Sequence, residues 1–84
     1  MRMRDYQERI YDALVTKKTW GGSNVVVRFE NGVSKVTYYW TTIAVVDHKA
    51  KTAKLNNGGF ENAATTARIN AVKEFCKDYN YKIK

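Results

Sequence analysis

Residues 25–40 read VVVRFENGVSKVTYYW and carry the clearest structural pattern of the chain. Apolar and polar side chains alternate on both sides of Asn31-Gly32, the pair preferred by two-residue type I′ turns. The pattern therefore predicts a β-hairpin closed by this turn. A two-residue turn places Arg28 directly opposite Lys35, so the turn and the alternation specify one register.

The predicted hairpin strands, 25–30 and 33–40, have one apolar face and one mixed face. The apolar face carries Val25, Val27, Phe29, Ser34, Val36, Tyr38 and Trp40. Arg28, Lys35 and Tyr39 fall on the mixed face, together with Val26 and Thr37. Because side chains alternate along a strand, we expect the first set to form the core side of the sheet.

A second hairpin and two helices are predicted around the first. Strands over 42–47 and 51–55, joined by His48, Lys49 and Ala50, would place Ile43, Val45, Ala53 and Leu55 on the core face. Helical spacing predicts one helix over 4–17, released by Gly21-Gly22, and another over 65–78 with Thr65 as its N-cap. Residues 80–84 are expected to form an irregular end or a short extra strand.

These elements predict an α+β fold, with the order α-β-β-β-β-α. We expect residues 1–84 to form a single small two-layer domain, an antiparallel four-stranded meander with both helices on one face. The chain has no proline and no internal repeat that would indicate a linker or a second domain.

The composition excludes several functional classes. One cysteine, Cys76, cannot form a disulfide framework within the chain, and no run approaches the roughly 20 apolar residues of a membrane span. One histidine and scattered acids predict no metal site and no cofactor. Asp47-His48 is interpreted as a polar turn, and 56–59 as a structural turn in preference to a phosphate cradle. We expect a protein that is not an enzyme.

The net charge of +7 and a pI of about 9.7 favour an anionic partner, such as nucleic acid, an anionic membrane surface or an acidic protein face, over a basic protein with no such partner. With both helices on one sheet face, the other face would present basic groups beside an aromatic ring, an arrangement that suits single-stranded nucleic acid. The side chains predicted to bind are Arg28, Lys35, Tyr39 and Lys54, extended by Arg68 and Lys73. The same face, with Val26, Tyr39, Ala44 and Val46, would also suit a homodimer or a protein partner, and an ordinary solvated sheet face is the remaining alternative.

Residues 38–70 carry a family resemblance. Thr42-Ile43-Ala44, Leu55-Asn56, Gly58-Gly59-Phe60, Thr65-Thr66 and Arg68-Ile69-Asn70 occur in order. In these motifs the chain resembles a family of small accessory proteins of tailed bacteriophages, although Ala63 or Ala64 stands where that family usually has Thr or Ser.

The resemblance implies a phage-encoded protein that acts in the host bacterial cytoplasm and assigns no catalytic residue. We therefore predict a non-enzymatic protein that binds nucleic acid through its basic sheet face, with no membrane partner. The alternative is an inhibitor that binds an acidic host protein or an anti-phage-defence complex such as a CRISPR complex.

Overall fold

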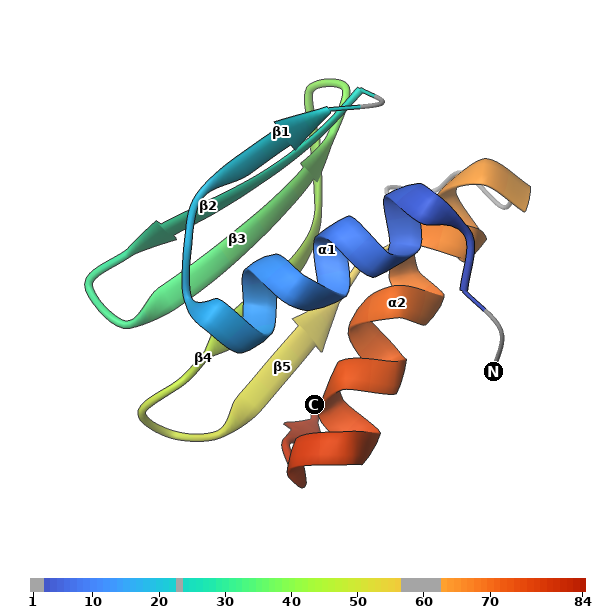
Figure 1. The fold of residues 1–84 in the computed structure, drawn as a ribbon. Coiled ribbons are helices and arrows are strands. Elements are labelled where there is room, and N and C mark those ends of the chain that lie inside the picture. Colours follow the sequence, from blue (N-terminus) through green and yellow to red (C-terminus); the bar gives the residue numbers. More distant parts are fainter. Residues whose placement is uncertain (1–2, 23, 57–62) are drawn as a thin grey trace.

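A computed structural model describes residues 3–22, 24–56 and 63–84, which form two helices on one face of a six-stranded sheet (Figure 1). The helices are α1 (Asp5–Thr16) and α2 (Ala63–Tyr79). The strands are β1 (Trp20–Gly22), β2 (Val25–Glu30), β3 (Val33–Tyr38), β4 (Thr41–Asp47), β5 (Thr52–Leu55) and β6 (Lys82–Ile83). They lie in the sheet in chain order. The predicted two-layer α+β architecture is confirmed.

The β2–β3 hairpin has the predicted register. Glu30 pairs with Val33, and Arg28 pairs with Lys35. Asn31 and Gly32 have φ values of 52° and 80°, the positive values that a type I′ turn requires at both central positions. The turn sequence therefore sets the register of this hairpin.

The predicted core face of β4 was wrong. Val46 and Ala44 are buried and Val45 is exposed, whereas Val45 was expected inside. The β4–β5 loop has four residues rather than three, with Lys51 at a φ of 54°, so Asp47 pairs with Thr52. A one-residue change of register moves alternate side chains to the other face.

A β-bulge keeps Ile43 in the core despite this change. Val36 pairs with Ala44 and Thr37 pairs with Thr42, so Ile43 is the extra residue on β4. Both Ile43 and Ala44 are buried as a result.

Strand β3 ends two residues earlier than predicted. Tyr38 pairs with Thr41, which leaves Tyr39 and Trp40 as a two-residue turn. Tyr39 has a φ of 55°, and its backbone N–H donates to the carbonyl oxygen of Asn24 at 2.8 Å. The turn removes Tyr39 from the mixed face of the strand and Trp40 from the core.

Two short strands extend the predicted meander of four. Trp20–Gly22 forms the edge strand β1, antiparallel to β2, although the glycines were expected only to release the first helix. That helix ends instead at Thr16, with Lys17 in the left-handed conformation. Strand β6 lies parallel to β5 at the opposite edge.

Helix α2 begins before Thr65, so the prediction of Thr65 as N-cap was wrong. Ala63 and Ala64 precede it in the helix, and alanine is the strongest helix former. Thr65 is buried on the inner side of α2 instead. The turn predicted at Asn57, Gly58 and Gly59 lies outside the described residues.

The core lies between the helices and the sheet. Helix α1 buries Ile10, Ala13 and Leu14, which have the spacing of one helix face. The main contributions of α2 are Ile69, Ala71, Val72, Phe75 and Cys76, and those of the sheet are Val25, Val27, Val36, Ile43, Ala44, Val46 and Ala53. This packing covers one face of the sheet, and no helix formed by the described residues lies on the other, the outer face (Figure 1).

Candidate functional site

Four residues form a straight row across the outer face of the sheet. Arg28 on β2 pairs with Lys35 on β3, Lys35 pairs with Val45 on β4, and Val45 pairs with Lys54 on β5. All four side chains are exposed. Neighbouring strands lie about 4.8 Å apart, so the row spans about 14 Å. We call these four residues the cation row.

The two sides of the cation row differ in charge. Glu30 and Asp47 lie beyond one side, on β2 and β4. The Asp47 carboxylate accepts hydrogen bonds from the backbone N–H groups of Lys49 and Ala50, at 3.0 and 3.1 Å. The other side, toward the β3–β4 turn, carries Val26, Thr37 and Thr42, which are the uncharged residues that the described strands place there. An extended anion on the row would therefore avoid carboxylates by running toward this turn.

A hollow of about 410 Å³ adjoins the cation row at the β5 end. It is lined by Thr42, Ala44, Val45, Lys54, Leu55 and Asn56. A second hollow, of about 360 Å³, shares Leu55 and Asn56 and extends to Ile69 and Lys73 of α2. Lys73 therefore lies on α2, past the Leu55 end of β5 from Lys54, and not on the outer face itself.

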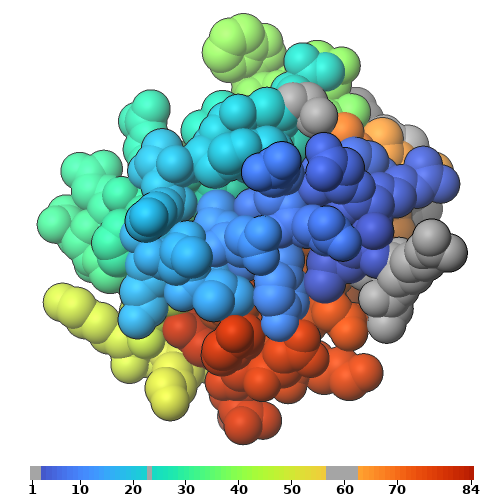
Figure 2. Space-filling view, in the orientation of Figure 1, coloured from blue at the N-terminus to red at the C-terminus, as the bar shows by residue number. Residues whose placement is uncertain are grey.

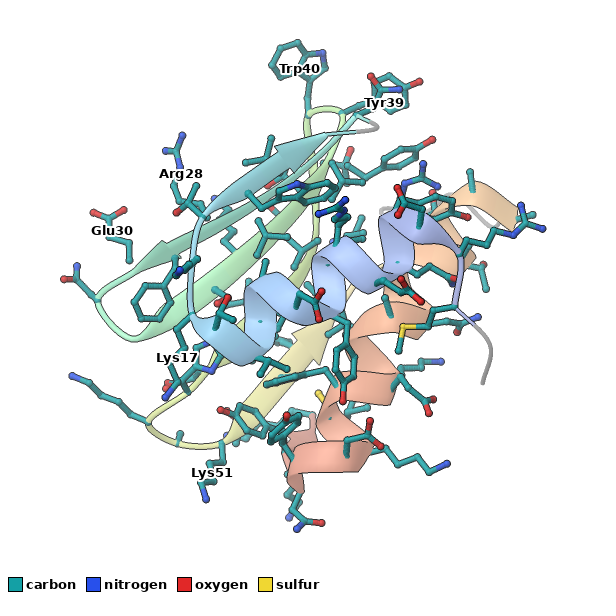
Figure 3. All side chains as sticks on the ribbon, in the orientation of Figure 1. Lys17, Arg28, Glu30, Tyr39, Trp40 and Lys51 are labelled. Atoms are coloured by element: carbon teal, nitrogen blue, oxygen red, sulfur yellow. The ribbon has the colours of Figure 1, made fainter. Side chains whose placement is uncertain are left out.

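The predicted aromatic residue Tyr39 lies outside the cation row. It is 58% exposed and sits in the turn at the end of β3 (Figure 3). It is four positions along the chain from Lys35, which corresponds to about 13 Å in a strand. Trp40, the next residue, is 98% exposed and was not predicted as a site residue.

Arg68 is not part of the outer face. The structure buries it, at 9% exposure, on the inner side of α2. Its guanidinium carbon lies 4.4 Å from the ring centroid of Tyr6 and 4.3 Å from that of Tyr38. Its Nη1 donates to the carbonyl oxygen of Ala64 at 2.8 Å. A cation held between two rings is a packing arrangement that joins α1, α2 and β3.

The surplus of positive charge lies outside the helices. Helices α1 and α2 carry five acidic and four basic side chains, whereas the rest of the chain carries three acidic and eleven basic ones. Figure 2 shows the side of the molecule on which α1 and α2 are visible. A hollow of about 400 Å³ there is lined by Met3, Glu8, Tyr11, Asp12, Glu74 and Asp78. A polyanion would be repelled by this acidic lining and attracted to the sheet.

A buried polar chain lies in the core, where the sequence indicated only a polar turn. His48 Nε2 hydrogen-bonds Ser34 Oγ at 2.7 Å, and His48 Nδ1 hydrogen-bonds the Tyr81 hydroxyl at 2.9 Å. Ser34 has no exposed surface, so its hydroxyl is out of reach of a substrate in this structure. The serine on the predicted core face was the available signal, because a buried hydroxyl requires a partner.

Burial is the main cause of the shifted pKa values of His48, Tyr81 and the nearby Cys76. Desolvation lowers the pKa of His48, and the nearby positive charge of Lys17 lowers it further, while Asp47 acts in the opposite direction. Desolvation raises the pKa of the Cys76 thiol and of the Tyr81 hydroxyl. A raised thiol pKa makes Cys76 a poor nucleophile.

The described residues contain no group of three or more His, Cys, Asp or Glu side chains that could hold a metal ion. Within the same residues, neither helix is long and apolar enough to span a membrane.

A family model described as Kyanoviridae Gp96 protein matches residues 3–84. The matched range includes the segment 38–70 that carries the phage resemblance. No curated protein and no solved structure matches the chain.

Proposed function

This chain belongs to the Kyanoviridae Gp96 protein family, a family of phage proteins, and we propose that it binds nucleic acid through the cation row of its sheet. Its place of action under this proposal is the cytoplasm of the host bacterium. The side chains that bind phosphates are Arg28, Lys35 and Lys54, and Lys73 extends the contact past the Leu55 end of β5.

The alignment of three cations in one row carries this proposal. Arg28 and Lys35 are like charges placed directly opposite each other on paired strands, which costs stability. The backbone of a nucleic acid carries regularly spaced negative charges that would relieve this repulsion. Val45, within the row, provides an apolar surface for a sugar or base between Lys35 and Lys54.

The charge distribution also argues against two copies joined through this face. A symmetric pair that matched the cation row to itself would bring positive side chains together across the interface. An acidic partner avoids this cost, and nucleic acid is the strongest polyanion available to such a surface.

Fluorescence anisotropy with labelled oligonucleotides tests the proposal. We expect wild-type protein to bind at low salt, with a log–log salt slope of about −2, because three phosphate contacts on a single strand contribute roughly −0.7 each. Arg28→Glu and Lys35→Glu should each lower the affinity at least tenfold.

Lys77→Glu is the matched control for these charge reversals. Lys77 is exposed on α2, so its reversal changes the net charge equally without touching the cation row. An affinity that falls equally with Lys77→Glu would indicate attraction by net charge alone and contradict a defined row. Absence of binding by wild-type protein at low salt would overturn the proposal.

The alternative partner is an acidic host or defence protein bound by the same face. In a pull-down from nuclease-treated host lysate, the wild-type protein would capture such a partner, and the Lys35→Glu variant would not. Such a result, together with absent oligonucleotide binding, would replace nucleic acid with protein as the target.

A further inference from the structure

Trp40 is the most exposed large apolar side chain among the described residues. It is 98% exposed and occupies the second position of the β3–β4 turn (Figure 3). Full hydration of an indole ring is unfavourable, and the fold gains no packing from it. An indole in this position is free to contact a ligand with both faces of its ring.

The turn that presents Trp40 is held in a sterically unfavourable conformation. Tyr39 has a φ of 55°, a region that bulky residues rarely adopt. Asn24 fixes Tyr39 at two points, since its carbonyl accepts from the Tyr39 backbone N–H at 2.8 Å and its side-chain amide donates to the Tyr39 hydroxyl at 3.3 Å. This conformation directs the next residue away from the core.

Side-chain contacts connect the turn to the body of the molecule. The rings of Tyr38 and Tyr39 lie 4.7 Å apart at an angle of 58°, and the guanidinium of Arg68 packs on the Tyr38 ring at 4.3 Å. The same guanidinium lies 4.4 Å from the ring centroid of Tyr6 on α1. The turn that carries Trp40 is therefore anchored to both helices, and an anchored backbone lowers the entropy cost of binding through the turn.

Trp40 lies on the uncharged side of the cation row. From Lys35, strand β3 runs through Thr37 to the turn, about 13 Å away at Tyr39. A strand of nucleic acid with phosphates on the row would avoid Glu30 and Asp47 by extending in this direction. Its next unstacked base would then reach the indole of Trp40.

We propose that Trp40 stacks on a base and makes the protein select single-stranded over double-stranded nucleic acid. This inference rests on the proposed function of the cation row. It adds a preference for single-stranded nucleic acid and names Trp40 as the residue responsible for it. Bases in a duplex already stack on their neighbours, whereas an unpaired base offers its face to an aromatic ring. A flat indole accepts any base, so the selection concerns strandedness and not sequence.

Four proteins test this proposal: wild type, Trp40→Leu, Trp40→Phe and Lys35→Glu. Each is titrated against a labelled oligothymidine and a duplex of equal length by fluorescence anisotropy at fixed salt. Trp40→Leu keeps an apolar side chain without a π face, and Trp40→Phe keeps a smaller ring. Because the ring has no packing role, both variants should unfold at the wild-type temperature.

We expect Trp40→Leu to lower single-strand affinity by about 5- to 150-fold, the range for losing one base–aromatic stack. Duplex affinity should stay unchanged, and Trp40→Phe should retain most of the single-strand affinity. In a Trp20→Phe background, unlabelled oligothymidine should quench the fluorescence of Trp40.

The possible failures are distinguishable. If wild type binds, Lys35→Glu does not, and Trp40→Leu binds single strands as well as wild type, the inference on Trp40 is wrong while the proposed function stands. If wild type binds neither oligonucleotide, both are wrong. Equal affinity for single strand and duplex in wild type would also overturn the inference.

Discussion

Polar side chains have interaction partners on the inner face of the sheet, whereas like charges face each other on the outer face. On the helix-covered side, Ser34, His48 and Tyr81 form a buried hydrogen-bonded chain, and Arg68 lies between two aromatic rings. Each of these groups is balanced by a neighbour, so its presence is explained by the stability of the fold.

The outer face shows the contrary arrangement. Arg28 faces Lys35 across a strand pair, and Trp40, in the β3–β4 turn at the end of this face, is almost fully hydrated. These residues lower the stability of the folded chain or leave it unchanged. The inner polar groups therefore maintain the structure, whereas Arg28, Lys35 and Trp40 are better explained by a ligand.

Replacing Arg68 should give the largest effect on stability. Arg68→Ala leaves the rings of Tyr6 and Tyr38 without the cation between them, and we expect a loss of about 3 kcal/mol in unfolding free energy. Urea denaturation measures it. Arg28→Ala is the control on the outer face and should stay within about 0.5 kcal/mol of wild type. Similar losses for the two variants would remove the distinction between the faces.

Removing the hydroxyl of Ser34 should give the next largest effect. Ser34→Ala leaves Nε2 of buried His48 without its partner, at a cost of about 1–3 kcal/mol. Thr37→Ala, a hydroxyl removed from the outer face of the same strand, should cost less. Equal costs, measured by thermal unfolding, would show that the buried chain contributes nothing specific.

The stability of the fold should fall in mild acid through His48. Its pKa is lowered in the folded state, so the folded chain favours the neutral ring and the unfolded chain binds the proton more readily. The stabilisation is complete above the unfolded pKa of about 6.5 and is lost as pH falls toward the folded pKa. The slope cannot exceed about 1.4 kcal/mol per pH unit for one group.

Unfolding curves between pH 7 and pH 5 measure this loss. His48→Gln, although less stable, should lack this part of the pH dependence, since His48 is the single histidine of the chain. An unchanged slope in His48→Gln would contradict the assignment to His48.

The smallest expected effect on the free energy of unfolding is a gain in stability. Lys35→Thr removes the like-charge pair with Arg28 and places a residue with high β propensity in β3, so we expect a gain of about 0.5 kcal/mol. The same variant should bind oligonucleotides more weakly. A variant that lost both stability and affinity would show that Lys35 serves the fold.

The sequence correctly predicted the β2–β3 hairpin, because neighbouring residues determine its turn and its register. Asn31-Gly32 and the alternation around it were sufficient for the β2–β3 register, and that register brought Arg28 and Lys35 together. The face of β4 was wrong because it depends on the left-handed Lys51 and on the bulge at Ile43. Neither feature has a strong sequence signal, since glycine is absent from both positions.

The same reasoning explains which site residues were misplaced. Arg68 falls beside the apolar stripe of α2, and its burial depends on Tyr6 and Tyr38, which are distant in sequence. Tyr39 and Trp40 continue the alternating pattern of β3, so nothing local indicated a turn there. The exposure of Trp40 emerges only from the pairing of Tyr38 with Thr41.

The residues that contact an added oligonucleotide can be identified by nuclear magnetic resonance. Amide chemical shifts of isotope-labelled protein should be recorded while an oligothymidine is added. We expect the largest changes at Arg28, Lys35, Val45 and Lys54, and at Trp40, with small changes along the outer surface of α1. Changes concentrated on the helices, or none at any position, would contradict binding through the outer face of the sheet.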